Sequence, residues 1–469
     1  MNSGPPITDK PVSILKALAL AVIAVATFHL AYLFDGCEFL IAIFLLGLFQ
    51  LARLRSARLA FYFGFAIGIA AYAPHLAFFW EIFGGGAIAL WCILSFWLGL
   101  FLLVGRACRN RFGPTIWACL APFIWTGIEF FRSELYYFRF SWLNPGYAFS
   151  HFSGLQFLAE FGTYGIGFLL MAWVAFLSSF ICLPAKVRIA YGIVLIGISS
   201  LPFLYPFSPT LGSTELIVTG VQLEECTAGQ TKLALDGALK HFPQTDLFVL
   251  SEYAFHGPVP QAIRDWCKAH HKFLLAGGED AISPTQYYNT AFAIAPDGEI
   301  AFKQAKCVPV QLMKDGTPAS SQHLWNSPWG KLGVGICYDA SYSRVTDNLV
   351  RQGAQGLIFP TMDLGDWGRH EHDLHARIGP MCAAEYRLPI LKVCSSGISQ
   401  LISRQGRVVV SAPFPGEGDL ISGRLELAGK GQMPPDRLLG RISVAITLAL
   451  VLWLLIDSIR GRRIKPSIP

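Results

Sequence analysis

The chain has 469 residues, enough for two or three domains, and 53% of them are apolar while only 14% are charged. Ordinary soluble proteins are less apolar and more charged, so this composition indicates a membrane protein and argues against an entirely soluble one. The formal net charge of +6 comes from basic loops between apolar segments and therefore does not imply a nucleic-acid partner.

Eight apolar segments approach the roughly 20 residues that a helix needs to cross a bilayer. Lysine and arginine gather in every second connection, for example at Arg53, Arg55 and Arg58. Because basic loops stay on the cytoplasmic side, both termini are predicted to be cytoplasmic. The predicted spans are Ala17–Leu33, Cys37–Ala52, Leu59–Trp80, Gly85–Val104, Gly113–Phe130, Phe161–Leu183, Ile189–Tyr205 and Ile442–Ile456.

These spans divide the chain into three predicted parts. Residues 1–211 form a membrane domain with seven helices, residues 212–439 form a domain outside the cytoplasm, and residues 440–469 form a last span with a basic cytoplasmic tail.

The outer connection Arg132–Glu160 is aromatic and only sparsely charged. It is either an interfacial aromatic belt or a loop that covers a lipid-facing site, and Trp142 and Tyr147 are its candidate lipid contacts.

Between Gly212 and Leu439, short strand-like runs alternate with helical stretches, which is typical of an α/β domain. Turn residues predict hairpins at Pro296–Glu299 and Arg404–Arg407. The predicted strands are Leu216–Leu223, Asp246–Glu252, Lys272–Gly278, Asn289–Ala295, Lys331–Asp339, Gly356–Thr361 and Pro389–Cys394. The predicted helices are Thr231–Phe242, Val259–His270, Ser343–Gly353 and His370–Tyr386.

The eleven cysteines show no CxxC pair and no metal-ligand spacing with histidine, so no metal and no cofactor are predicted. Three histidines, His370, His372 and His375, lie close together in "GRHEHDLH" but lack the pattern of a zincin helix. We interpret them as a solvated helix start.

Three residues form a chemically coherent set. Glu252 and Cys337 end apolar strands, and Lys306 lies in the connection between them, where α/β proteins place reactive groups. A carboxylate can take the thiol proton, an ammonium can stabilise an oxyanion, and a thiolate can attack an acyl carbon. The set therefore predicts a cysteine nucleophile at position 337.

These residues resemble the nitrilase superfamily, whose triad is Glu, Lys and Cys and whose fold is an αββα sandwich. "LSEYAF" is similar to its glutamate motif, "YNTAFAIAPDGEI" to the hairpin before its lysine, and "GVGICYD" to its cysteine elbow. Such a domain between seven spans and one terminal span resembles the apolipoprotein N-acyltransferase family. "APFIWTGIEFFRSEL" and "FSWLNPGYA" are similar to the fifth span and outer loop of that family.

The resemblance implies Glu252 as general base and Cys337 as nucleophile, but it leaves the lysine open. One alignment selects Lys306, three residues before Pro309–Val310, and another puts Gln304 at the position with Lys303 one residue out of register; Lys306 is predicted as the oxyanion stabiliser, with Lys303 as the alternative. The second active-site glutamate of the family has no match, although Asp315 is near enough to replace it. The supporting residues implied are Tyr338, Asp339 in place of the usual glutamate, and Glu385.

The resemblance further implies an enzyme of the bacterial inner membrane with its catalytic domain in the periplasm. A thioester on Cys337 would carry an acyl chain from a phospholipid, phosphatidylethanolamine being the expected donor. The acceptor would be the α-amine of a diacylglyceryl-cysteine at the N-terminus of a lipoprotein. Two alternatives remain: a membrane-tethered amidase of the nitrilase type, and a non-catalytic protein that binds lipid or lipoprotein.

Overall fold

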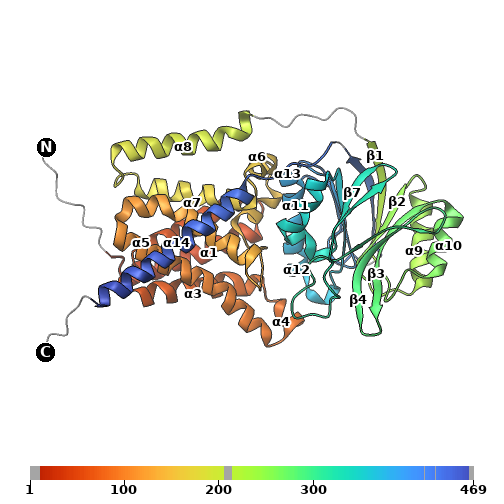
Figure 1. The fold of residues 1–469 in the computed structure, drawn as a ribbon, viewed down its shortest axis with the longest axis horizontal. Helices are drawn as coiled ribbons and strands as arrows, with labels where there is room; N and C mark the ends of the chain where they lie inside the picture. Colours follow the sequence, from red (N-terminus) through yellow and green to blue (C-terminus); the bar gives the residue numbers. More distant parts are fainter. Residues whose placement is uncertain (1–10, 205–213, 417, 428, 464–469) are drawn as a thin grey trace.

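The computed structural model describes residues 11–204, 214–416, 418–427 and 429–463. The predicted boundary between residues 211 and 212 and the last residue of the seventh predicted span, Tyr205, lie outside these ranges. A helical region occupies one end of the molecule and a region with two sheets the other (Figure 1). The last helix returns from the sheets to the helical region, so the first and last parts of the chain pack together.

The helical region is built from long apolar helices, as the composition predicts. Within the described part of the chain, five helices are long and apolar enough to cross a membrane, or six if the bent pair Leu155–Phe161 and Thr163–Ser179 counts as one. The helices are α1 (Ile14–Leu33), α2 (Ile41–Leu51), α3 (Ala57–His75), α4 (Phe79–Phe83), α5 (Gly86–Phe130), α6 (Leu155–Leu158), α7 (Thr163–Ser179), α8 (Ala185–Leu204) and α14 (Asp436–Arg463).

Three predicted spans differ from the helices observed. The predicted span Leu59–Trp80 is divided, because α3 ends at His75 and a separate short helix, α4, begins at Phe79. The predicted spans on either side of Gly113 join into α5, which is interrupted where Gly113 adopts a φ of 82°. Glycine tolerates this left-handed conformation because it has no Cβ.

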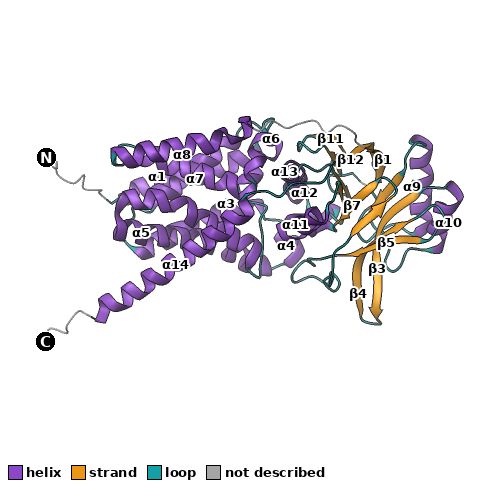
Figure 2. Cartoon of the chain, turned by 45° about the horizontal axis from the view of Figure 1, so that its top comes forward, coloured by secondary structure: helices purple, strands orange, loops and turns teal. Residues whose placement is uncertain are grey.

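The other end of the molecule is a sandwich of two six-stranded sheets (Figure 2). The first sheet has the order β12-β1-β2-β3-β4-β5 and the second β11-β10-β9-β8-β7-β6. The strands are β1 (Thr214–Val221), β2 (Leu247–Leu250), β3 (Phe273–Ser283), β4 (Gln286–Ile294), β5 (Ile300–Ala305), β6 (Leu324–Ser327), β7 (Gly330–Val334), β8 (Gly356–Thr361), β9 (Ile390–Cys394), β10 (Gln400–Ile402), β11 (Val408–Ser411) and β12 (Leu420–Leu427).

Alternating side chains hold the layers together. Leu247 and Val249 of β2 belong to the core between the sheets, whereas Phe248 and Leu250 belong to the core under the outer helices. This two-residue period follows from the pleat of a strand, whose successive side chains point to opposite faces. Helices α9 (Ala228–His241) and α10 (Gln261–His270) cover the first sheet, and α11 (Ser343–Gln352) and α13 (Ile378–Tyr386) cover the second. The αββα architecture is therefore present.

All seven predicted strands and both predicted hairpins occur, with ends that shift by a few residues. The predicted helix His370–Tyr386 is two helices, α12 (Arg369–Ala376) and α13, which meet at Arg377. The Arg377 guanidinium donates to the Tyr32 carbonyl at 2.8 Å and to the Ser150 hydroxyl at 3.2 Å. The junction of the two helices thus binds the helical region to the sheets.

Candidate active site

Four strand ends converge on one buried site. Glu252 follows β2, Lys306 follows β5, Cys337 follows β7, and Met362 follows β8. Carboxyl ends of parallel strands share one edge of a sheet, and α/β proteins place their reactive groups there. Gly277 of β3 allows the close approach, because a Cβ at this position would lie 2.6 Å from the Cα of Glu252.

Glu252 and Lys306 form a buried ion pair, with 2.8 Å between Lys306 Nζ and Glu252 Oε1. Lys306 Nζ also lies 2.6 Å from Asp315 Oδ2, so one ammonium bridges two carboxylates. The Asn289 amide donates to both acids, at 2.6 Å to Glu252 and 2.9 Å to Asp315. Asp315 thus occupies the position of a second acid in the site, as its place in the sequence suggested.

The two candidate lysines have different surroundings. Lys306 is 1% exposed and faces the pocket of Cys337. Lys303 lies on β5 and pairs with Asp280 at 2.9 Å, with 46% of its side chain exposed. Only Lys306 is therefore placed to act on a group bound at Cys337.

Cys337 adopts a φ of 49°, in the left-handed region that non-glycine residues seldom enter. Its thiol donates weakly to the Met362 carbonyl at 3.8 Å, and the Met362 N–H donates to Glu252 Oε2 at 2.8 Å. Strain of this kind persists where surrounding contacts enforce it, and it is frequent at reactive positions. Met362, which the sequence analysis did not single out, thus bridges the carboxylate and the thiol.

Burial raises the pKa of Glu252 despite the opposing charge of Lys306. Burial and the Glu252 carboxylate also raise the pKa of the Cys337 thiol well above its usual range. Burial lowers the pKa of Lys306, but Glu252, Cys337 and Asp315 outweigh this and raise it well above the ordinary value. The site thus combines a neutral thiol, a carboxylate with increased basicity and a permanent ammonium. Acyl transfer through cysteine requires these three groups.

Asp339 and Tyr338 hold the loop of the nucleophile. Burial raises the pKa of Asp339 to about 6. Its carboxylate accepts the backbone N–H groups of Ile336, Cys307 and Val308 at 2.8–3.1 Å. Asp339 therefore connects the segment after Lys306 to the segment of Cys337. The Tyr338 hydroxyl donates to the Arg139 carbonyl at 2.9 Å and so connects that loop to the helical region.

The three central residues open into a pocket whose empty space, counted together with the solvent at its mouth, is about 1010 Å³. Its far wall comes from the helical region and is strongly apolar. The residues of that wall are Phe78, Phe79, Ile82, Phe83, Leu90, Ile93, Leu94, Phe138, Phe140 and Trp142. Trp142 donates to the Ser341 hydroxyl at 2.9 Å, so its loop contacts the short helix that begins at Cys337.

Two other predicted residues lie elsewhere. Tyr147 and Glu385 line a separate cavity together with Arg437. The Glu385 carboxylate accepts the Thr163 N–H at 2.8 Å and an Arg437 N–H at 3.2 Å. Glu385 thus joins α13, α7 and α14, and among the described residues it forms no hydrogen bond or ion pair with Glu252, Lys306 or Cys337. Tyr147 likewise does not line the cavity of Cys337.

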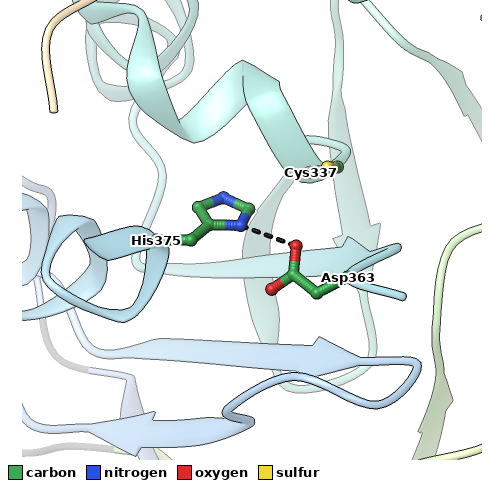
Figure 3. Close-up of side chains that lie close together, drawn as sticks. All are labelled: Cys337, Asp363 and His375. Carbon is green, nitrogen blue, oxygen red and sulfur yellow. Dashed lines mark hydrogen bonds and ion pairs between the residues drawn. The ribbon is translucent and has the colours of Figure 1, made fainter. Parts of the chain in front are cut away.

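His370, His372 and His375 do lie at the start of a helix, α12, but the prediction that they are solvated was wrong for His372 and His375. His372 and His375 are buried, and His370 Nε2 lies 2.9 Å from His75 Nδ1 of α3. His375 Nδ1 lies 2.7 Å from Asp363 Oδ1, and both residues lie close to Cys337 (Figure 3). The indole of Trp142 stacks on His375, so residues distant in the sequence exclude water from this helix.

The rate of thioester formation should fall as the pH is lowered. Glu252 accepts a proton only when it is ionised. Because its pKa is raised, the rate should begin to fall at a pH above the ordinary glutamate pKa of about 4.3. Stopped-flow acylation between pH 4 and 9 checks this, with Glu252→Gln as the control that lacks the acidic limb. A wild-type rate that stayed constant down to pH 4 would contradict the assignment.

Two family models match the chain. Residues 16–197 match the N-terminal domain of apolipoprotein N-acyltransferase, and residues 215–434 match carbon-nitrogen hydrolase. A solved carbon-nitrogen hydrolase from Helicobacter pylori is 18% identical, with a TM-score of 0.41, and the match covers 46% of this chain and 90% of that one.

Curated relatives match different shares of the chain. The apolipoprotein N-acyltransferase of Pasteurella multocida is 23% identical over 81% of this chain and 83% of its own length. The Bdellovibrio bacteriovorus protein of that name is 23% identical over 38% of this chain and 40% of its own length. An omega-amidase of Xenopus laevis is 24% identical over 33% of this chain and 62% of its own length. The two domains in this order, together with the match to the Pasteurella protein along most of both chains, support an apolipoprotein N-acyltransferase of the nitrilase superfamily.

Proposed function

We propose that this chain is a membrane enzyme that transfers an acyl chain from a phospholipid to the N-terminal amine of diacylglyceryl-modified lipoproteins. The observation that carries the proposal is the cavity, in which Cys337, Glu252 and Lys306 face an apolar wall supplied by the helical region. A small amide would not need such a wall, whereas a fatty acyl chain gains about 0.8 kcal/mol for each methylene that it buries.

In the first half of the reaction, Glu252 takes the proton of the Cys337 thiol and the thiolate attacks the ester carbonyl. An ammonium has three N–H donors, and two of those on Lys306 face Glu252 and Asp315. The third stabilises the oxyanion of the tetrahedral intermediate. When the intermediate collapses, Glu252 protonates the departing alcohol of the lysophospholipid, and the acyl chain remains on sulfur as a thioester.

In the second half, the α-amine of the lipoprotein cysteine attacks the thioester carbonyl. Glu252 receives a proton from the amine and delivers it to the sulfur as the carbon–sulfur bond breaks. The products are an amide and the free Cys337 thiol. One carboxylate thus serves first as base and then as acid in each half of the reaction.

The proposal includes a topology. In this proposal eight spans cross a bacterial inner membrane, both termini are cytoplasmic, and the sheet region lies in the periplasm. The basic connections support this orientation, and the lengths of the helices support at least five of the spans. The proposed donor is a phospholipid of the surrounding bilayer, and phosphatidylethanolamine is the one that the resemblance to the family implies.

Intact-mass measurement tests the proposal directly. The purified chain, incubated with phosphatidylethanolamine alone, should gain the mass of one acyl chain, which hydroxylamine removes because it cleaves thioesters. The Cys337→Ala variant should gain no mass. Adding a diacylglyceryl-cysteine peptide should return the wild-type chain to its original mass and acylate the peptide.

The same measurement separates the alternatives. An amidase would leave the chain unmodified by phospholipid and would release ammonia from small amide substrates. A binding protein without activity would do neither. Either result would refute the acyltransferase.

A further inference from the structure

A second group of ligand-type side chains lies beside Cys337, and the proposed acyl transfer does not use it. Asp363 follows β8, and Glu371 and His372 begin α12. All three are at most 1% exposed. One ligand atom from each lies within 4.8 Å of the others.

Several atoms of this group have no hydrogen-bond partner among the described residues. They are both ring nitrogens of His372 and Oε2 of Glu371, although the Leu364 backbone lies near His372 and the Nδ1 and Oε2 atoms lie near each other. The ring of His372 stacks on Phe414, with 4.2 Å between the centroids, so its position is set by packing. A buried polar atom without a partner lowers the stability of the fold by about 1–3 kcal/mol. This loss indicates that these atoms bind a ligand.

The spacing of the atoms fits a metal ion better than a hydrogen bond. His372 Nδ1 and Glu371 Oε2 are 3.5 Å apart. Two ligands at about 2.1 Å from a tetrahedral zinc ion are about 3.4 Å apart. A Cβ added at Gly397 would lie 2.7 Å from both His372 Nδ1 and Asp363 Oδ2, so these two atoms converge on one point beside a residue without a side chain.

We propose that Asp363, Glu371 and His372 bind a divalent transition-metal cation of the zinc type. Two carboxylate oxygens and one imidazole nitrogen are a suitable donor set for such an ion. Asp363 is already oriented by outer contacts, since Oδ1 lies 2.7 Å from His375 Nδ1 and Oδ2 lies 3.4 Å from Lys392 Nζ. A carboxylate oxygen has more than one lone pair, so Asp363 can keep these partners while it binds the cation.

The cation has a structural role in this proposal. Asp363 is adjacent to Met362, which contacts both Glu252 and the Cys337 thiol. A metal bound by Asp363 and by the start of α12 fixes the segment after β8 and hence the distance between base and nucleophile. Cys337 itself stays free for acylation.

Metal binding to the full-length chain in detergent tests this proposal. After removal of metal with a chelator, dialysis against Zn²⁺ should restore about one ion per chain. His372→Ala and Glu371→Gln should weaken this binding by more than about tenfold. Gly397→Ala should do the same, because its methyl group would lie against two ligand atoms. His370→Ala, on the same helix but bonded to His75, is the matched control and should bind as the wild type does.

A spectrum of the wild-type chain makes the test independent of how the variants fold. Co²⁺ in the site should show ligand-field bands and no intense thiolate charge-transfer band, and Cys337→Ala should leave this spectrum unchanged. A thiolate band would overturn the proposal, since the ion would then sit among Cys337, Asp363 and His375. Failure to retain Zn²⁺, or equal retention by His372→Ala, would overturn it as well.

Discussion

Replacing Lys306 with alanine should slow thioester formation by at least about 100- to 1000-fold, the cost of removing one oxyanion donor. The change also leaves Glu252 and Asp315 as buried carboxylates without the ammonium that joins them. Acylation by phosphatidylethanolamine, followed by intact mass in single-turnover experiments, measures the effect. Lys306→Arg should recover little, because a planar guanidinium does not reproduce a compact ammonium between two acids.

The matched control is Lys303→Ala. Lys303 forms an exposed pair with Asp280, and such pairs contribute only about 0–1 kcal/mol. Its rate should stay within about fivefold of the wild type. If the Lys303 variant lost acylation while the Lys306 variant kept it, the assignment of the lysine would be refuted.

Replacing Arg437 with alanine should destabilise the protein by about 3–5 kcal/mol, the cost of breaking a buried ion pair. Arg437 lies in the first turn of α14 and is 8% exposed. Its guanidinium lies 3.1 Å from Asp347, 3.2 Å from Glu385 and 2.7 Å from Asp436. Without it, three carboxylates share one buried site with no cation to compensate them.

Thermal unfolding in detergent, followed by tryptophan fluorescence, should show a decrease in Tm on the order of 10 °C. Arg351→Ala is the matched control, because Arg351 pairs with the same Asp347 at 3.4 Å but is 54% exposed. Its Tm should change by no more than about 2–4 °C. Equal shifts in the two variants would show that burial does not determine the strength of these pairs.

The strands of the sheet region could be predicted because their patterns are local. Runs such as β2 and β8 are apolar on both faces, since each lies between another sheet and a layer of helices. Glu252 could be singled out for the same reason, as the first carboxylate after such a run. The second acid, Asp315, was only a candidate by proximity in the chain, and its contact with Lys306 became visible in the structure.

The burial of the histidines of α12 could not be predicted from local patterns. His372 and His375 stand among charged residues, so their segment has no apolar periodicity to predict burial. They are buried because Trp142 and Phe414 stack on them from distant parts of the chain. No local pattern contains that information.

The sequence by itself determined most of the apolar helices, the positions of seven strands and the presence of Glu252, a nearby lysine and Cys337, because periodicity and composition are properties of neighbouring residues. Only the tertiary structure decided that Lys306 rather than Lys303 faces the thiol and that Glu385 serves the junction with α14. It also decided that helices from the first third of the chain line the cavity. These outcomes depend on side chains that are distant in the sequence and meet only in the folded chain, where burial and charge act through space.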